Sequence, residues 1–170
     1  FTFDDGYQGA FEHGAAALDA DGLTGTFYIF TDTIDIYDAP LAGTELIREY
    51  RNKGFEIGSN TTNHSNLGLL TANQDYETLN DVLGNSVDLL NQRFDQETSS
   101  MSIPFGSFRM ETLDEISKHF YTARSSQYGF NLPTPYDFFA LRSWPILSSS
   151  TPQFVDGLVQ TAETYGYYLP

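Results

Sequence analysis

The sequence contains no cysteine, few cations and no long apolar run. Without Cys in its 170 residues there is no disulfide framework, and thiolate nucleophiles and thiolate metal ligands are excluded. Only 8 Lys and Arg stand against 23 Asp and Glu, and this net charge of −15 argues against nucleic acid and anionic membranes as partners. No apolar run approaches the roughly 20 residues of a membrane-spanning helix, so we predict no transmembrane segment. The hydrophobic content of 40% is enough for one core and predicts one domain over residues 1–170.

Short apolar runs alternate along the chain with helix-like stretches that carry an apolar stripe. The strands are predicted over 1–3, 25–30, 55–58, 101–103 and 120–123, with further strands over 138–141 and 166–169. The helices are predicted over 10–20, 44–53, 71–94, 110–119 and 151–164, and residues 127–136 are predicted to be a loop. Repeated strand–helix units favour parallel strands with right-handed crossovers, which means an α/β barrel or a doubly wound sheet.

Candidate functional residues follow three of the predicted strands. Asp4 and Asp5 follow the first strand, residues 60–64 follow the third, and Pro104-Phe105-Gly106 follows the fourth. The carboxyl ends of parallel strands are where active sites gather in such folds. Two adjacent carboxylates repel each other, so the aspartate pair needs a cation or an exchangeable proton nearby.

The segment from Asn60 to His64 offers ligands for a cation. These two residues are four positions apart, so one helical turn would direct both side chains toward a single point. If that point lies over Asp5, a carboxylate oxygen, an amide oxygen and an imidazole nitrogen surround one divalent cation and leave a position open for water. We predict a metal site of Asp5, Asn60 and His64, with Zn²⁺ expected first and Mn²⁺, Co²⁺ or Mg²⁺ as alternatives, while Asp4 stays free to take a proton.

Three motifs resemble those of one enzyme family, the polysaccharide deacetylases of the NodB-homology group (carbohydrate esterase family four). Thr2-Phe3-Asp4-Asp5-Gly6 resembles the first motif, residues 55–64 resemble the second, and residues 102–106 resemble the third, an Arg-x-Pro-Tyr/Phe-Gly pattern. Their order and spacing match. The resemblance implies a deformed (β/α)₇ barrel and metal-dependent removal of acetyl groups from a polysaccharide or oligosaccharide, above all N-acetylglucosamine polymers, outside the cell or in its envelope.

The resemblance also implies roles for individual residues. Asp4 would be the general base, and Asp5 and His64 would be metal ligands. The substrate would contact the third motif, where a backbone N–H near Phe105 would add to the oxyanion site. Independently of the resemblance, Trp144 is the only Trp, and its ring face suits stacking on a sugar; core packing beside Pro145 is the alternative. These substrate-contacting residues are Pro104, Phe105, Gly106 and Trp144.

The sequence departs from the family pattern at three places. Asn60 stands where the family has its first metal-binding His, and an amide oxygen is a harder and poorer donor, so Zn²⁺ affinity should fall and Mn²⁺ or Mg²⁺ could compete. Ser102 replaces the Arg that braces the catalytic Asp, and Arg142 is our predicted substitute. The catalytic acid, a His in a Leu-x-His motif, would follow Leu169. We therefore expect this sequence to be a fragment clipped at both ends of the barrel.

Two other functions fit the same residues. Asn60 and Ser102 also suit a glycan-binding domain that has kept the cleft and lost the metal. A metal-independent amidase of the same fold is a further alternative, although Asp5 and His64 speak against it.

Overall fold

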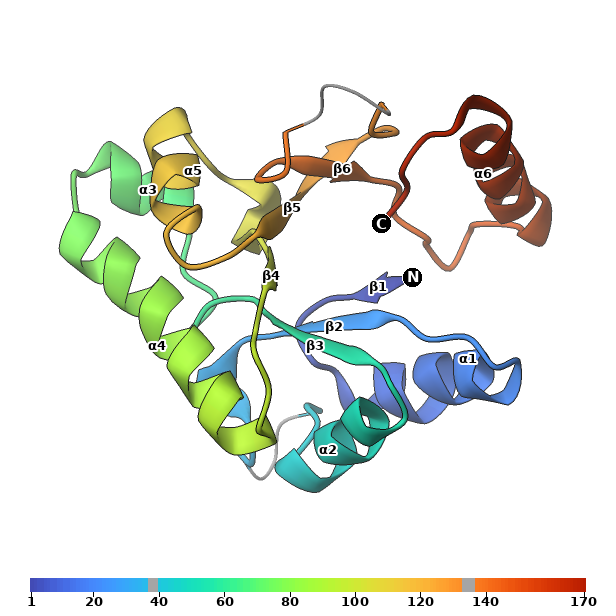
Figure 1. Cartoon of the computed structure of the whole chain (residues 1–170), viewed down its shortest axis with the longest axis horizontal. Coiled ribbons are helices and arrows are strands. Elements are labelled where there is room, and N and C mark those ends of the chain that lie inside the picture. The colour runs from blue at the N-terminus through green and yellow to red at the C-terminus, as the bar shows by residue number, and fades with distance from the viewer. Residues whose placement is uncertain (37–39, 133–136) are drawn as a thin grey trace.

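The protein is a curled parallel sheet with helices on its outer side (Figure 1). The computed structural model describes residues 1–36, 40–132 and 137–170. Within these ranges six strands form one sheet in chain order, and every pairing is parallel. The strands are β1 (Thr2–Phe3), β2 (Thr26–Ile29), β3 (Glu56–Ser59), β4 (Ser100–Ser102), β5 (Thr122–Tyr128) and β6 (Leu141–Ser143). The predicted α/β barrel class is confirmed, with β1 and β6 as the two edges of the curled sheet.

The first five helices connect successive strands and cover the convex side of the sheet, whereas the last helix follows the last strand and lies apart from them (Figure 1). The helices are α1 (Ala16–Ala20), which continues a π-helical turn over Ala10–Ala15, α2 (Thr44–Asn52), α3 (Leu67–Ala72), α4 (Tyr76–Phe94), α5 (Met110–Ile116) and α6 (Pro152–Tyr165). In the residues described by the structure, no helix has the length and apolar character to cross a membrane.

The prediction of one long helix over residues 71–94 is wrong at the N-terminal end. The chain forms α3 and α4 there, and Gln74 between them has a left-handed φ of 59°. Asp75 then begins α4, because its carboxylate accepts a hydrogen bond from the backbone N–H of Thr78 at 3.2 Å. The apolar stripe continues across the break, so hydrophobic periodicity could not reveal it. The run Asn73-Gln74-Asp75, rich in capping and turn residues, was the available signal.

The last strands also differ from the prediction. β5 continues to Tyr128 instead of ending at Ala123, and β6 lies at Leu141–Ser143 instead of 138–141. The predicted strand over 166–169 is reduced to one antiparallel bridge between Tyr168 and Asn131. After Ala123, β5 continues with polar residues, of which Arg124 and Ser125 are buried, so the apolar alternation that signals a strand is missing there. The predicted loop over 127–136 begins after β5, and its residues 133–136 lie outside the described ranges.

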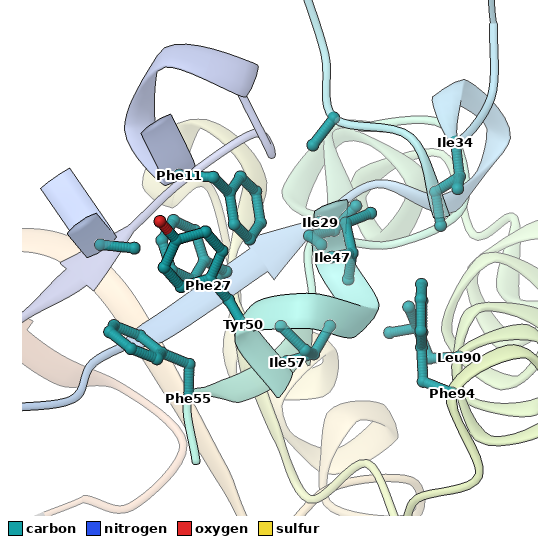
Figure 2. Packing of buried hydrophobic residues seen from close by; sticks show 12 residues of the cluster. Phe11, Phe27, Ile29, Ile34, Ile47, Tyr50, Phe55, Ile57, Leu90 and Phe94 are labelled. Atoms are coloured by element: carbon teal, nitrogen blue, oxygen red, sulfur yellow. The ribbon is translucent and has the colours of Figure 1, made fainter. Parts of the chain in front are cut away.

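Two apolar clusters hold the helices on the sheet. The first lies between β2, β3 and the surrounding helices, where the rings of Phe11 and Phe27 stack with centroids 3.8 Å apart (Figure 2). The second joins β4 to α3, α4 and α5 and includes Leu79, Met101 and Ile116. Each such fully buried side chain contributes about 1.5–3 kcal/mol of transfer free energy. The clusters fix the strands, and thereby the loops that follow their carboxyl ends.

A distant aspartate caps helix α2. Gly43 precedes the helix and has no side chain to offer, so the Asp35 carboxylate accepts hydrogen bonds from the backbone N–H (2.6 Å) and the hydroxyl (2.7 Å) of Thr44. Arg93 of α4 pairs with the same carboxylate at 3.1 Å. The hydrogen bonds from Thr44, with a smaller effect of Arg93, lower the pKa of Asp35. One carboxylate therefore joins α2 to α4.

We expect Asp35→Ala to lower the free energy of unfolding by about 1 kcal/mol, the usual cost of losing a helix cap. The pKa of Asp35 is lowered in the folded state, so this contribution is complete above its ordinary pKa of 3.8 and is lost as the pH falls through the lowered value. Urea unfolding at pH 7 measures it. Asp32→Ala, at an exposed neighbouring aspartate, is the control and should change stability by less than about 0.5 kcal/mol. Equal losses in the two variants would contradict the capping role.

Candidate active site

The site lies at the carboxyl ends of neighbouring strands. Asp4 and Asp5 follow β1, residues 60–64 follow β3, and a 3₁₀ turn over Pro104–Gly106 follows β4. Since these strands are parallel neighbours in the sheet order β1-β2-β3-β4, their following loops meet at one edge. The structure therefore brings together segments that are far apart in the sequence.

Three backbone hydrogen bonds attach the loop after β3 to the end of β2 and to the turn that follows it. The N–H of Asn60 donates to the Ile29 carbonyl at 2.8 Å, the N–H of Thr31 donates to the Thr61 carbonyl at 3.1 Å, and the N–H of Asp32 donates to the Thr62 carbonyl at 2.8 Å. The loop is a turn and not the helical turn that we predicted, because Thr61 and His64 have left-handed φ angles of 67° and 60°. The fixed turn still directs the Asn60 and His64 side chains to one place.

Left-handed backbone is concentrated at this site. Of the seven described non-glycine residues with positive φ, four belong to it: Asp5, Thr61, His64 and Phe105. Each such residue costs on the order of 1 kcal/mol, and the surrounding structure must compensate for it. A site at which four strained residues cluster is typical of a functional centre.

The side chains of Asn60 and His64 converge on one oxygen of Asp5. Asn60 Nδ2 donates to Asp5 Oδ1 at 3.0 Å, and His64 Nε2 lies 3.3 Å from the same oxygen. The structure thus brings together the three predicted metal ligands. Burial raises the pKa of Asp5, and the neighbouring His64 opposes that rise. A carboxylate that has lost much of its hydration is stabilised by a cation.

The buried amide of Asn60 fits a metal ligand. Asn60 is 1% exposed, and its Oδ1 has no hydrogen-bond partner among the described residues. An orphaned buried oxygen is costly, and a cation would satisfy it. A half-turn of the amide about its terminal bond would place Oδ1 where Nδ2 now meets Asp5. Carboxylate oxygen, amide oxygen and imidazole nitrogen together form a donor set that suits divalent cations of borderline to hard character.

Asp4 turns away from this cluster and pairs with Arg124 on β5. Nη2 of Arg124 contacts Asp4 Oδ1 and also donates to the Ser102 hydroxyl at 2.8 Å. The Asp4 side chain is 45% exposed, whereas the Arg124 side chain is 7% exposed. The two adjacent carboxylates therefore have different partners, Asp5 the amide and imidazole and Asp4 a buried guanidinium, and their mutual repulsion is offset.

The prediction that Arg142 braces Asp4 is wrong. In β6 the side chains of Leu141 and Ser143 are buried, so Arg142 between them points to the other face, where its guanidinium contacts the Tyr128 carbonyl at 3.4 Å. Arg124 has the predicted position instead. We missed it because the strand was predicted to end at Ala123, one residue earlier. A single arginine at the end of an apolar strand was the signal that could have identified it.

The turn after β4 places Phe105 beside His64. The Phe105 ring packs edge-on against the His64 imidazole with ring centroids 4.6 Å apart. The Phe30 ring contacts the same imidazole at a tilt, with ring centroids 5.4 Å apart. Phe105 is nevertheless 65% exposed, so much of its ring faces solvent, while Pro104 is buried. Two aromatic rings thus orient His64, and one of them is also available to a ligand.

Trp144 lines a cavity of about 670 Å³ whose wall also includes Asp4 and Arg124. Its indole packs against Tyr128 (5.8 Å) and Phe130 (6.0 Å). The structure therefore places Trp144 both in an aromatic cluster and in a cavity wall beside Asp4. This cavity does not include Asp5, Asn60 or His64 among its lining residues, so it adjoins only the Asp4 side of the site.

Gly106 is a position that only glycine fits. A Cβ added there would lie 1.8 Å from the Ser126 hydroxyl and 2.9 Å from the Ser126 backbone nitrogen, at a φ of +59°. We expect Gly106→Ala to lower the free energy of unfolding by about 3 kcal/mol through overpacking and backbone strain. Gly157→Ala is the matched control, since a Cβ there meets nothing within 4 Å and should stabilise α6 by about 0.5–1 kcal/mol. Chemical denaturation measures both changes, and a neutral Gly106→Ala would contradict the close approach of β5.

Known proteins of one family are similar to this chain. A family model described as polysaccharide deacetylase matches residues 1–123. The protein YxkH of Bacillus subtilis (strain 168) is 30% identical over 117 residues, which cover 69% of this chain and 40% of YxkH. This chain therefore spans less than half the length of that relative.

Solved structures show the same fold. The Streptococcus pyogenes deacetylase PplD, in complex with acetate, matches with a TM-score of 0.83 and 19% identity over 94% of this chain and 68% of PplD. A mutant of BA3943, described as a pseudoenzyme of carbohydrate esterase family four with restored enzymatic activity, matches with a TM-score of 0.63 and 15% identity over 99% of this chain and 63% of its own. With its motifs, its site geometry and the family match over residues 1–123, the chain belongs to the polysaccharide deacetylase family.

Proposed function

We propose that the protein is a metal-dependent hydrolase that removes acetyl groups from a polysaccharide of the N-acetylglucosamine type, outside the cell or in its envelope. One observation carries this proposal: Asn60 and His64 converge on Asp5, while the adjacent Asp4 is directed to a separate partner, Arg124. The arrangement supplies a candidate cation site and a carboxylate base side by side, which together can activate water for hydrolysis of an amide.

Each residue of the site has a part in this chemistry. A divalent cation held by Asp5, Asn60 and His64 would acidify water and polarise the acetyl carbonyl. Asp4 Oδ1 is engaged by Arg124, which leaves the second carboxylate oxygen to accept a proton from the attacking water. The C–N bond of the acetamide then breaks, and the newly formed C–O bond is kept in acetate. The departing amine takes up the proton that Asp4 accepted from the water.

The surroundings of the site suit a sugar. The exposed Phe105 ring lies beside His64, and the Trp144 indole lines the cavity that includes Asp4, and pyranose rings pack on such apolar faces. We assign the backbone N–H of Phe105, on the turn after β4, as an additional donor to the developing oxyanion. Pro104 and Gly106 shape this turn, the first by its buried ring and the second by its close contact with β5.

A second candidate function is glycan binding without catalysis. It is favoured by the hydrogen bond from Asn60 to Asp5, which satisfies the carboxylate without a metal. Binding of chitin oligomers that persists in chelator, without acetate release, would support this candidate. A metal-independent amidase would instead retain turnover in chelator.

We expect acetate release from N-acetylglucosamine oligomers in the presence of Mn²⁺, Co²⁺ or Zn²⁺, and we expect Asp4→Asn to lower kcat on the order of 10²–10⁴-fold because the general base is lost. Asp21→Asn, at an exposed turn, is the matched control and should retain kcat. Acetate release is measured by a coupled assay on chitin oligomers, poly-N-acetylglucosamine and acetylxylan. No release from any substrate with any of these ions, or full activity in Asp4→Asn, would reject the proposed function.

Replacing the amide ligand by imidazole should strengthen Zn²⁺ binding. We expect Asn60→His to raise Zn²⁺ affinity on the order of tenfold, since imidazole is the better donor for this ion, and to raise Mn²⁺ affinity less. Isothermal titration calorimetry measures both affinities directly. Asn63→His is the control, because it adds a histidine to the same turn on an exposed side chain. An equal gain in both variants, or no gain in Asn60→His, would place the cation elsewhere.

A further inference from the structure

We propose that a row of aromatic rings near the active site binds further sugar residues of a glycan chain, at a distance from the acetyl group that reacts. This aromatic row consists of Tyr165, Tyr167, Phe130 and Trp144. The inference rests on the proposed function for the class of ligand, a chain of N-acetylglucosamine residues. It requires neither a metal nor turnover.

The rings of the aromatic row form an unbroken series of contacts. Tyr165 stacks on Tyr167 with ring centroids 5.5 Å apart and an angle of 21° between the ring planes. Tyr167 contacts Phe130 at 5.5 Å, and Phe130 contacts Trp144 at 6.0 Å. These spacings are comparable to the width of a pyranose ring, so a chain that follows the row can place successive sugars against successive aromatic side chains.

The aromatic row leads from open solvent to the cavity beside Asp4. Tyr165 is 62% exposed and forms the outer end of the row. Trp144 is half-buried at the inner end, where it lines the same cavity as Asp4. Exposed aromatic side chains that form a continuous surface are typical of an interaction site, and this surface is continuous with the candidate active site.

The two tyrosines of the row also offer polar groups to a ligand. Within residues 1–36, 40–132 and 137–170, the phenol hydroxyls of Tyr165 and Tyr167 have no hydrogen-bond partner. Each hydroxyl can both donate and accept a hydrogen bond. An apolar ring face together with a free hydroxyl suits a sugar, which presents C–H groups on its faces and hydroxyls on its rim.

A glycine turn brings the two tyrosines together. Helix α6 ends at Tyr165 because Gly166 has a left-handed φ of 66°, and the N–H of Tyr167 then donates to the Ala162 carbonyl at 2.9 Å. The chain reverses within one residue, so the second ring returns to the first. The stacked pair is therefore a consequence of the way in which the helix ends.

One buried asparagine holds the segments of the row together. Asn131, which directly follows Phe130, is 5% exposed. Its side chain donates to the Arg142 carbonyl at 2.9 Å and accepts from the Arg142 N–H at 2.9 Å. Its backbone exchanges hydrogen bonds of 3.0 and 2.9 Å with Tyr168, the residue after Tyr167. The row is thus organised before a ligand arrives, which lowers the conformational entropy that binding costs.

The charge of the protein favours a glycan of this kind as the occupant. A net charge of −15 repels anionic polymers, whereas a neutral N-acetylglucosamine chain meets no such repulsion. A chain that has lost acetyl groups carries ammonium charges, which an acidic protein attracts. Both the proposed substrate and its product therefore suit the aromatic row.

The test measures binding of the N-acetylglucosamine disaccharide and hexasaccharide to the purified protein in chelator, which prevents metal-dependent turnover. Calorimetry gives the two values of Kd. We expect the wild-type protein to bind the hexasaccharide about tenfold more tightly than the disaccharide, because only the longer chain reaches the outer rings. Trp144 is the only tryptophan, so a change in its fluorescence with the hexasaccharide reports occupancy of the row directly.

Tyr165→Ala removes the outer ring of the row. We expect this variant to weaken hexasaccharide binding about fivefold and to change disaccharide binding less than about twofold. Tyr121→Ala is the matched control, since Tyr121 is 72% exposed and precedes β5, outside the row, and it should leave both affinities unchanged. If Tyr165→Ala does not fold, the length dependence and the fluorescence of the wild-type protein decide.

Failure of this proposal and failure of the proposed function give different results. Hexasaccharide binding that depends on Tyr165, without acetate release from any substrate, would reject the proposed function and support the aromatic row. Acetate release with equal affinity for the two oligosaccharides would do the reverse.

Three further results would overturn the proposal. They are unchanged Trp144 fluorescence at saturating hexasaccharide, equal effects of Tyr165→Ala and Tyr121→Ala, and a protein dimer in sedimentation that Tyr165→Ala abolishes while hexasaccharide binding is unaffected. The last result would assign the aromatic row to contact between two copies of this chain.

Discussion

The candidate site is built around one carboxylate oxygen, Oδ1 of Asp5, which the side chains of Asn60 and His64 from a distant loop both contact. Asn60 and His64 reach it only because β1 and β3 are parallel and end at the same edge of the sheet. The loop that carries them has two left-handed residues and is hydrogen-bonded to the end of β2. The strain of that loop is balanced by the packing of the strands beneath it, so the apolar core and the polar site are parts of one arrangement.

Adjacent aspartates acquire different properties from this arrangement. Asp5 has a left-handed φ of 68°, which separates its direction from that of Asp4. Asp5 is directed to the amide and imidazole, and burial raises its pKa in the absence of a cation. Asp4 is directed to the guanidinium of Arg124 on the opposite side. Division of labour between two carboxylates, one for a cation and one for a proton, follows from these environments and not from the residue type.

Much of the site could be predicted from the sequence, because its residues follow strands whose apolar pattern is clear. Asp5, Asn60 and His64 meet as expected, although the turn that carries the last two is not helical. Arg124 was missed for a physical reason. After Ala123 the residues of β5 are polar up to Gln127, and both Arg124 and Ser125 are buried, so apolar alternation is lost and the predicted end fell one residue before the arginine. The break between α3 and α4 was hidden in the same way, by an apolar stripe that continues across it.

The central claim, that a cation lies among Asp5, Asn60 and His64, is tested most directly by anomalous diffraction from crystals grown with Mn²⁺. The account predicts one strong peak within about 2.5 Å of a carboxylate oxygen of Asp5 and of the His64 ring, with the Asn60 amide oxygen turned toward it. No peak at these residues at millimolar Mn²⁺, with Asn60 Nδ2 still donating to Asp5, would contradict the claim.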